Sequence, residues 1–310
     1  MLIGILAGLA TCALWGLTFI APRAVEPFSA WDLTIARYGI FGATCLFLML
    51  DRRFRPTGLS PKRIVIGLLL GGLGYVGYFV CAAHAVTLAG AAIPPLVIGL
   101  MPVLTALIAN THEKAADWRA IALPLVLIGA GLAVVNLATL GSVGAGARQN
   151  IVTGTLMAVA ALLIWVGYGL ANAAVMRAPD APDGLRWTGL QGIGAALGSA
   201  TLLPLARFDG TAAQLVPFVT WALVMGLAGS WLATVFWVIA SRRLPLTLAA
   251  QLIVAETVFG LSYGFAFESR WPTAAEALGC ALQVAGVAWG IRAMTRGRMV
   301  RDRETIEGIT

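Results

Sequence analysis

Long apolar runs alternate with short polar segments along the whole chain. A window of about 19 residues divides this pattern into ten helices, each long enough, at about 1.5 Å per residue, to cross a bilayer. The expected spans are 2–21, 30–50, 64–88, 92–110, 119–139, 151–175, 187–206, 216–240, 244–267 and 274–292. The pattern therefore predicts an all-α integral membrane protein with ten transmembrane helices and little soluble domain.

Composition agrees with a membrane protein and narrows its chemistry. The 310 residues are 59% hydrophobic and 11% charged, whereas a soluble domain carries about 25% charged residues. The N-terminal apolar run is long and lacks a basic segment, so we expect a retained first membrane helix and no cleaved signal peptide. The four cysteines lie singly inside apolar runs, and the chain has no Gly-rich phosphate loop and no HExxH pattern. We therefore expect no metal, no disulfide framework, no cofactor and no ATP hydrolysis.

Basic residues follow the predicted helices with a strong side preference. Sixteen lie on one side, namely Arg52, Arg53, Arg55, Lys62, Arg63, Lys114, Arg119, Arg177, Arg186, Arg242, Arg243, Arg292, Arg296, Arg298, Arg301 and Arg303. Four lie on the other side, namely Arg23, Arg148, Arg207 and Arg270. Because Lys and Arg are retained on the cytoplasmic side, we expect both termini in the cytoplasm. The same placement argues against a nucleic-acid partner despite the net charge of +7.

The sequence contains two copies of one unit. "GILAGLATCALWG" at 4–16 resembles "GTLMAVAALLIWV" at 154–166, and the offset between the copies becomes 155 further on. The matched pairs are Gly4 and Gly154, Trp15 and Trp165, Gly71 and Gly226, Gly74 and Gly229, Glu113 and Glu268, and Gly131 and Gly286. Each copy holds five spans, so the second enters the membrane from the opposite side, which is an inverted repeat. The expected domains are 1–145 and 146–295, followed by a basic cytoplasmic tail at 296–310.

Several motifs in these copies carry a family resemblance. The first half has "LWGLTF", "ARYGIFGA" and "MPVLTALIANTHE", and the second has "AETVFGLSYGFAFES" and "GCALQVAGVAWG". With these motifs the chain resembles the EamA branch of the drug/metabolite transporter superfamily from about residue 4 to 292, and most of all its YddG-type bacterial amino-acid exporters. Thr257 stands where that family usually has a second-half proline. The resemblance implies a secondary transporter built from two inverted repeats.

Aromatic rings and weak polar groups share faces of several predicted helices. A lipid-facing surface has no need of the hydroxyls on these faces, so we expect the faces to converge on a central chamber between the halves. Such a chamber suits a small zwitterion with an apolar side chain, because rings stack on rings and attract an ammonium group. The expected substrate-binding residues are Trp15, Thr18, Tyr75, Tyr78, Trp165, Tyr168, Trp237 and Glu256. Helix packing is the alternative role for each ring.

Other tryptophans and several helix breakers have positions that indicate different roles. Trp31, Trp118, Trp187 and Trp271 lie at span ends, where we expect them to anchor at the lipid headgroups. Proline removes a backbone hydrogen bond and glycine loosens a helix, so breakers at corresponding places of the two copies suit the opening and closing of a chamber. The expected hinge residues are Pro94, Pro95, Gly99, Pro102 and Gly260.

Glu256, Arg37 and His84 are ionisable residues inside predicted spans that could have a role in transport. Glu256 faces the bundle interior by default, where it either attracts an ammonium group, carries a proton, or holds a structural hydrogen bond. Arg37 either snorkels or draws a carboxylate into the pathway. His84 lies near a span end, where a packed and hydrogen-bonded role is favoured over a proton relay.

These observations predict an exporter of amino acids, aromatic or apolar ones included, that works by alternating access and is either secondary active or facilitative. Ten helices in two halves form a complete pathway, so we expect a monomer surrounded by lipid. The alternative with the same fold is a proton-coupled exporter of lipophilic cationic drugs or metabolites. A third hypothesis, a membrane acyltransferase, rests on His112 and Asp117 in "HEKAAD" and is disfavoured because this loop is short. We therefore expect no catalytic residues.

Overall fold

The computed structural model describes residues 1–90, 92–101, 103–104, 107–108, 118–142, 144–244 and 252–307, and this part of the chain consists of helices and connecting turns. In chain order the helical elements are α1 (Leu2–Gly16), η1 (Leu17–Phe19), α2 (Ala21–Ala24), α3 (Ala30–Leu48), η2 (Arg52–Phe54), α4 (Pro61–Leu69), η3 (Leu70–Val76), α5 (Gly77–Ala89), α6 (Ile93–Ile98), α8 (Trp118–Ser142), α9 (Ala145–Met176), α10 (Gly184–Ala200), η4 (Leu203–Leu205), α11 (Ala212–Leu223), η5 (Val224–Leu232), α12 (Ala233–Arg243), α14 (Val254–Phe267) and α15 (Ala274–Glu307).

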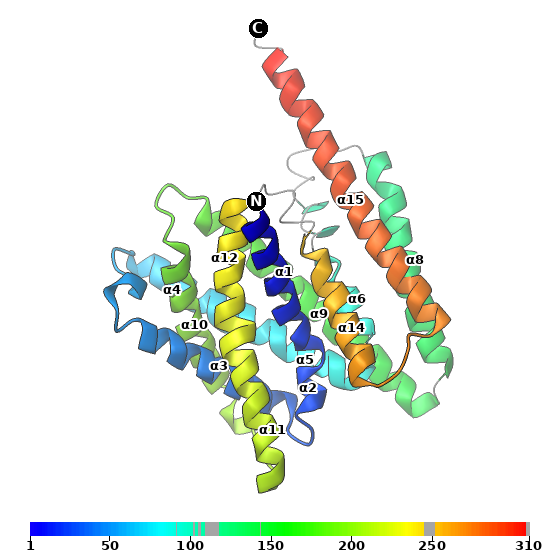
Figure 1. Cartoon of the computed structure of the whole chain (residues 1–310), viewed down its shortest axis with the longest axis horizontal. Helices are drawn as coiled ribbons and strands as arrows, with labels where there is room; N and C mark the ends of the chain where they lie inside the picture. The colour runs from blue at the N-terminus through cyan, green and yellow to red at the C-terminus, as the bar shows by residue number, and fades with distance from the viewer. Residues whose placement is uncertain are drawn as a thin grey trace.

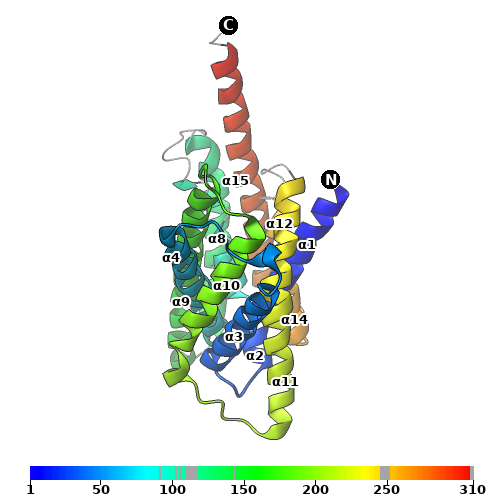
Figure 2. The ribbon, with the colours of Figure 1, turned by 90° about the vertical axis from the view of Figure 1, so that its left-hand side faces the viewer.

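The helices form one bundle with both chain termini at the same end (Figures 1 and 2). α8 and α15 pack along each other as a pair at one side of the bundle, and the last turns of α15 project beyond it (Figure 1). The other helices gather around α1, α5, α9 and α14, which meet near the middle of the bundle. This central meeting place holds the candidate site.

Five helical stretches of the described chain are long and apolar enough to cross a membrane. They are Leu2–Phe19, Pro61–Ala89, Ala122–Gly141, Gly146–Met176 and Ala212–Arg243, and Leu252–Phe267 is a shorter apolar helix. The chain is therefore an all-helical protein with several candidate membrane spans. The expectation of ten spans goes further than this set and stays a prediction.

Side-chain caps fix where several helices begin. Ser29 and Asp32 form a reciprocal capping box at the start of α3, and Asp183 accepts from two backbone N–H groups at the start of α10. Such caps satisfy N–H groups that have no partner inside the helix. The two caps stand 154 positions apart, so the two helices start at corresponding places of the repeated sequence.

Two long helices contain π-helical turns, in which backbone bonds span five residues instead of four. One is η3, between α4 and α5, and the other is η5, between α11 and α12. Gly71 and Gly74 lie in η3, and their sequence partners Gly226 and Gly229 lie in η5. A local irregularity of the backbone thus recurs about 155 positions later in the chain.

Close backbone contacts recur with the same offset. A side chain at Gly71 would collide with the backbone carbonyl of Gln191 in α10, and one at Gly226 would lie 2.9 Å from the backbone carbonyl of Arg37 in α3. In the outer pair of helices, a side chain at Gly131 would lie 2.7 Å from the carbonyl of Gly279. These helices pack through backbone surfaces, as small residues allow in membrane proteins.

Candidate functional site

A small cavity lies where η1, α6, α9 and the start of α14 come together. Its volume is about 10 Å³, which is room for about one water molecule. The lining residues are Phe19, Ile98, Gly99, Met101, Trp165, Ile253, Glu256 and Thr257. Four of these residues form two pairs with an offset of 155, Ile98 with Ile253 and Met101 with Glu256. The cavity therefore lies between corresponding segments of the two sequence copies.

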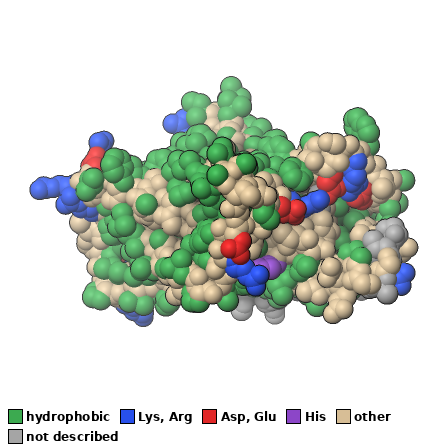
Figure 3. Space-filling view, turned by 90° about the horizontal axis from the view of Figure 1, so that it is seen from below, with side chains coloured by type: hydrophobic (Ala, Val, Ile, Leu, Met, Phe, Trp, Pro, Cys, Tyr) green, Lys and Arg blue, Asp and Glu red, His purple; other side chains and the backbone are tan. Residues whose placement is uncertain are grey.

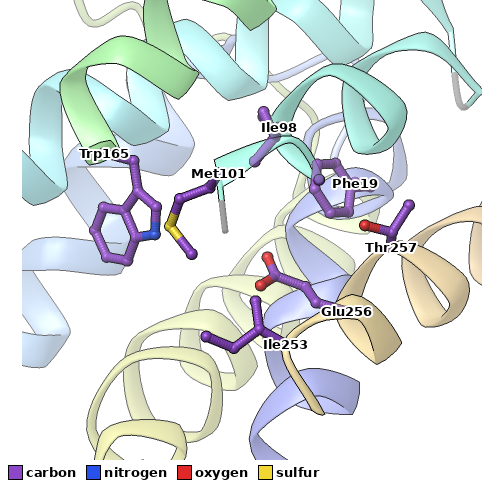
Figure 4. A pocket seen from close by; sticks show the side chains of 8 residues that line it. Phe19, Ile98, Met101, Trp165, Ile253, Glu256 and Thr257 are labelled. Atoms are coloured by element: carbon purple, nitrogen blue, oxygen red, sulfur yellow. The ribbon is translucent and has the colours of Figure 1, made fainter. Parts of the chain in front are cut away.

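Glu256 is the ionisable residue of this lining. It belongs to the first turn of α14, and Figure 4 shows its carboxylate pointing toward the space between Met101 and Phe19. In the described part of the chain, no donor bonds either carboxylate oxygen. A carboxylate in an apolar surrounding is unfavourable without a counter-charge or a proton.

Three tryptophans form a connected group next to the cavity. The ring centroids of Trp15 and Trp165 are 6.4 Å apart in an edge-to-face arrangement. The rings of Trp15 and Trp237 are 5.9 Å apart. Figure 4 shows the Trp165 ring beside Met101, on the far side of the cavity from Thr257. The structure brings together these three expected residues, which come from α1, α9 and α12.

Tyr75 and Tyr168 lie against Trp165, but their hydroxyl groups are already bonded. The Tyr75 hydroxyl donates to Oε1 of Gln191 at 2.8 Å, and the single proton of the Tyr168 hydroxyl has two acceptors at 2.9 Å, Oε1 of Gln191 and the Tyr75 oxygen. The Gln191 amide nitrogen donates to Asn172 at 3.0 Å. In this arrangement the two phenols position helices, and only their ring faces remain for a ligand.

Gln191 is a residue that the sequence analysis missed. It is buried in α10 and connects η3 with α9 through the bonds described above. The Asn172 carbonyl at its far end also accepts from the indole of Trp187 at 2.7 Å. Trp187 is 2% exposed, so the expectation that it anchors at the headgroups is wrong. Its bonding partner lies inside the bundle, whereas Trp271 is 91% exposed and free to play that role.

Tyr78 and Thr18 are buried close to the cavity. The Tyr78 ring lies 4.7 Å from the Trp165 ring. Thr18 belongs to η1, directly before the cavity residue Phe19. Both expected residues therefore lie next to residues of the cavity lining.

Arg37 in α3 is 5% exposed. Its Nε donates to the Ser230 hydroxyl at 3.0 Å, and Nη2 donates to the Gly229 carbonyl at 3.3 Å. The guanidinium carbon lies 4.2 Å from the centre of the Phe79 ring. The third nitrogen, Nη1, is buried without a hydrogen-bond partner. The arginine therefore lies inside the bundle and does not snorkel to its surface.

Four of the expected hinge residues lie in the described chain. Pro94 and Pro95 begin α6, and Gly99 ends it with bonds typical of a tight turn. Gln283 of α15 donates to the Leu96 carbonyl at 2.8 Å, so α15 supports this short helix. Gly260 lies against Phe19 so closely that a side chain would collide with the ring. Pro102 lies outside the described residues, and movement at the other four stays a prediction.

Ion pairs join the first and last parts of the chain at the end of the bundle opposite the termini. Glu268, which follows α14, pairs with Arg23 and, at 2.6 Å, with Arg270. Arg270 also pairs with Glu276 at 2.7 Å, and this bond raises the pKa of the arginine. Figure 3 views this end, where apolar side chains predominate and charged ones gather in a few places.

The remaining candidates carry little chemistry. His84 bonds the Val80 carbonyl at 2.8 Å and packs 4.6 Å from the Trp31 ring, as a structural histidine does. His112 and Asp117, the residues of the acyltransferase hypothesis, lie outside the described residues. A search of the described chain finds no group of three His, Cys, Asp or Glu side chains that could hold a metal ion.

Comparisons with known proteins show what the chain is similar to. Residues 2–136 match the model of the EamA-like transporter family. The chain is 29% identical over 315 residues to inner membrane protein YtfF of Escherichia coli (strain K12), covering 94% of this chain and 96% of the relative. A solved crystal structure whose description names no function shares the fold, with a TM-score of 0.62, 22% identity, and coverage of 94% of this chain and 98% of the other. Residues 2–136 are thus similar to the EamA-like transporter family, and the likeness to inner membrane protein YtfF extends over nearly the whole chain.

Proposed function

We propose that the protein exports amino acids, aromatic and other apolar ones included, by alternating access of its two halves to a shared central site. The observation that carries the proposal is the Glu256 carboxylate, which lacks a bonding partner in the described chain and lies near the rings of Trp15 and Trp165. A carboxylate next to aromatic faces favours an ammonium group. The rings provide the contact surface for an apolar side chain. No catalytic residue is assigned, because the same groups suit binding and release.

The proposed architecture is two inverted repeats of five spans, at 1–145 and 146–295. The recurrence of π-helical turns and of backbone contacts about 155 positions apart supports it. The contacts between the two segments also support it. α5 of the first segment packs on α9 of the second, and α1 of the first packs on α12 of the second. Repeats related in this way place a substrate site between them and let one half rock against the other.

The central cavity has to widen before it can hold an amino acid, since it has room for about one water molecule. The short helix α6 and the start of α14 form one wall, and both lie next to the hinge residues Gly99 and Gly260. Movement of these two helices away from Trp165 enlarges the space without disturbing the Gln191 network. We therefore propose that the structure represents a closed state.

Location and orientation in the membrane are also part of the proposed function. The relative from Escherichia coli is an inner membrane protein, and the basic residues favour the side of the membrane that holds both termini. We propose a monomeric, multi-pass protein of the bacterial inner membrane with its termini, and the basic tail at 296–310, in the cytoplasm. Labelling of cysteines introduced at positions 145 and 270 tests this orientation. Reaction of either from the cytoplasmic side would refute it.

Transport by the purified protein tests the substrate. Proteoliposomes are loaded with labelled phenylalanine, leucine and glutamate, and efflux is compared with that from empty vesicles. We expect flux of phenylalanine and leucine, and its loss in Glu256→Gln. Asp51→Asn, which removes an exposed carboxylate far from the cavity, is the matched control and keeps the flux. Wild-type protein that moves no amino acid would refute the proposal.

A second candidate function, proton-coupled export of lipophilic cations, is favoured by the same carboxylate and rings. It predicts that a pH gradient drives flux of a lipophilic cation such as tetraphenylphosphonium, and that Glu256→Gln abolishes it. The amino-acid proposal predicts instead that such a cation, which has no carboxylate, competes poorly with phenylalanine. Competition in the proteoliposome assay separates the two.

A further inference from the structure

Among the described residues, the guanidinium group of Arg37 is a buried cation without an anionic partner. Its two hydrogen bonds go to the neutral Ser230 hydroxyl and Gly229 carbonyl, and Nη1 has no partner. The rings of Phe79 and Tyr38 lie 4.2 and 5.2 Å from its central carbon. Ring faces attract a cation but do not neutralise its charge. The site is thus arranged for a cation and leaves one donor unused.

The other half of the chain shows what this position needs for packing alone. Gln191 stands 154 positions after Arg37, and each residue approaches a π-helical turn of the opposite half through its carbonyl, at Gly71 and Gly226 respectively. Each also bonds a side chain of that turn, Gln191 to Tyr75 and Arg37 to Ser230. At Gln191 a neutral amide is enough to connect the helices. Packing alone therefore does not require the charge of Arg37.

The carboxylate of Glu256 does not form an ion pair with Arg37. No ion pair joins Arg37 to an acidic residue in the part of the chain that the structure describes. The Tyr78 ring lies 4.7 Å from the ring of Trp165, which lines the cavity of Glu256, and the ring of the next residue, Phe79, lies 4.2 Å from the Arg37 guanidinium carbon. Two consecutive aromatic residues of α5 thus connect the surroundings of the carboxylate with those of the guanidinium group. A zwitterion with an apolar side chain has the matching distribution of charge.

We propose that Arg37 binds the carboxylate of the transported molecule, opposite Glu256, which binds its ammonium group. This inference rests on the proposed function and adds the residue that selects amino acids over simple amines. Arginine suits the role, because its planar fork offers two parallel donors to a carboxylate. The unpartnered Nη1 supplies one donor, and Nη2 exchanges its weak 3.3 Å bond for the other.

The test compares phenylalanine with phenethylamine, which has the same ring and ammonium group but no carboxylate. Both compete against labelled phenylalanine for binding to the purified wild-type protein and to Arg37→Gln. In the wild type we expect phenylalanine to bind about 10- to 100-fold more tightly than the amine, as a charge-assisted bond implies. In Arg37→Gln we expect phenylalanine affinity to fall to the level of the amine, with amine affinity unchanged.

Two further variants separate recognition from folding. Ser230→Ala removes the structural bond to Nε and keeps the charge, so it should retain the preference for phenylalanine. Arg37→Lys keeps the charge without the planar fork and should retain part of the preference. Equal loss of both ligands in Arg37→Gln, or no loss of either, would overturn the inference alone. A wild type that binds no phenylalanine would refute the proposed function and the inference together.

Discussion

Replacing Gln191 by leucine should destabilise the bundle without removing the binding groups. The side chains are similar in size, but leucine cannot make the three hydrogen bonds to Tyr75, Tyr168 and Asn172. Inter-helix hydrogen bonds in membranes contribute about 0.6 kcal/mol each, so the loss is about 2 kcal/mol. At about 2–4 °C per kcal/mol, the melting temperature should fall by about 4–8 °C.

Thermal unfolding of the detergent-solubilised protein, followed by tryptophan fluorescence, measures this shift. A double-mutant cycle with Tyr75→Phe identifies its cause, because that variant removes one donor of the same network. The two changes should be less than additive, since each removes the bond between the two side chains. Strict additivity, or an unchanged melting temperature in Gln191→Leu, would refute the structural role of the network. Competition binding of phenylalanine should stay near the wild-type level in both variants.

Three further variants test other parts of the fold. Gly226→Ala places a methyl group 2.9 Å from a backbone carbonyl of α3 and should cost about 1–3 kcal/mol in unfolding free energy, whereas Gly129→Ala, with nothing within 4 Å, should cost little. Glu268→Gln removes the partner of two arginines and should lower the melting temperature at low ionic strength but much less in high salt, because screening weakens partly exposed pairs. Bonding to Arg63 lowers the pKa of the Asp180 carboxyl, so this exposed pair stabilises the fold above the ordinary value of 3.8 and loses its effect as the pH falls through the lowered pKa. The small difference in melting temperature between wild type and Asp180→Asn at neutral pH should therefore vanish in acid.

The helical architecture and the candidate rings could be predicted from the sequence because both depend on local pattern. Apolar runs specify membrane helices with little help from tertiary structure. The spacing of Trp15 and Trp165 in the two copies placed both rings near a common centre, and the structure brings them into contact. Residues 2–136 match the model of the family that the sequence motifs resemble.

The polar interior was harder to predict, because it depends on partners far apart in the chain. Gln191 carries no local signal beyond being an amide among small residues, and its bonds reach α9 and η3. Trp187 lies at a span end like a headgroup anchor, but its bond to Asn172 holds it inside. A regular helix with 3.6 residues per turn also does not describe η3. Gly74 and Tyr75 differ in direction by about 100° on a regular helix, yet both approach Tyr168.

The π-helical turns at η3 and η5 have a mechanical consequence. A turn with one surplus residue leaves a backbone carbonyl without its usual N–H donor. In η5 the Ser230 hydroxyl donates a hydrogen bond to the Met225 carbonyl instead. Exchanging one hydrogen bond at a time moves the surplus residue along the helix, and each step rotates the intervening residue onto another face. Each of these two long helices thus has a place at which it can rotate locally. Such a rotation changes which side chains face the interior while the helix stays continuous.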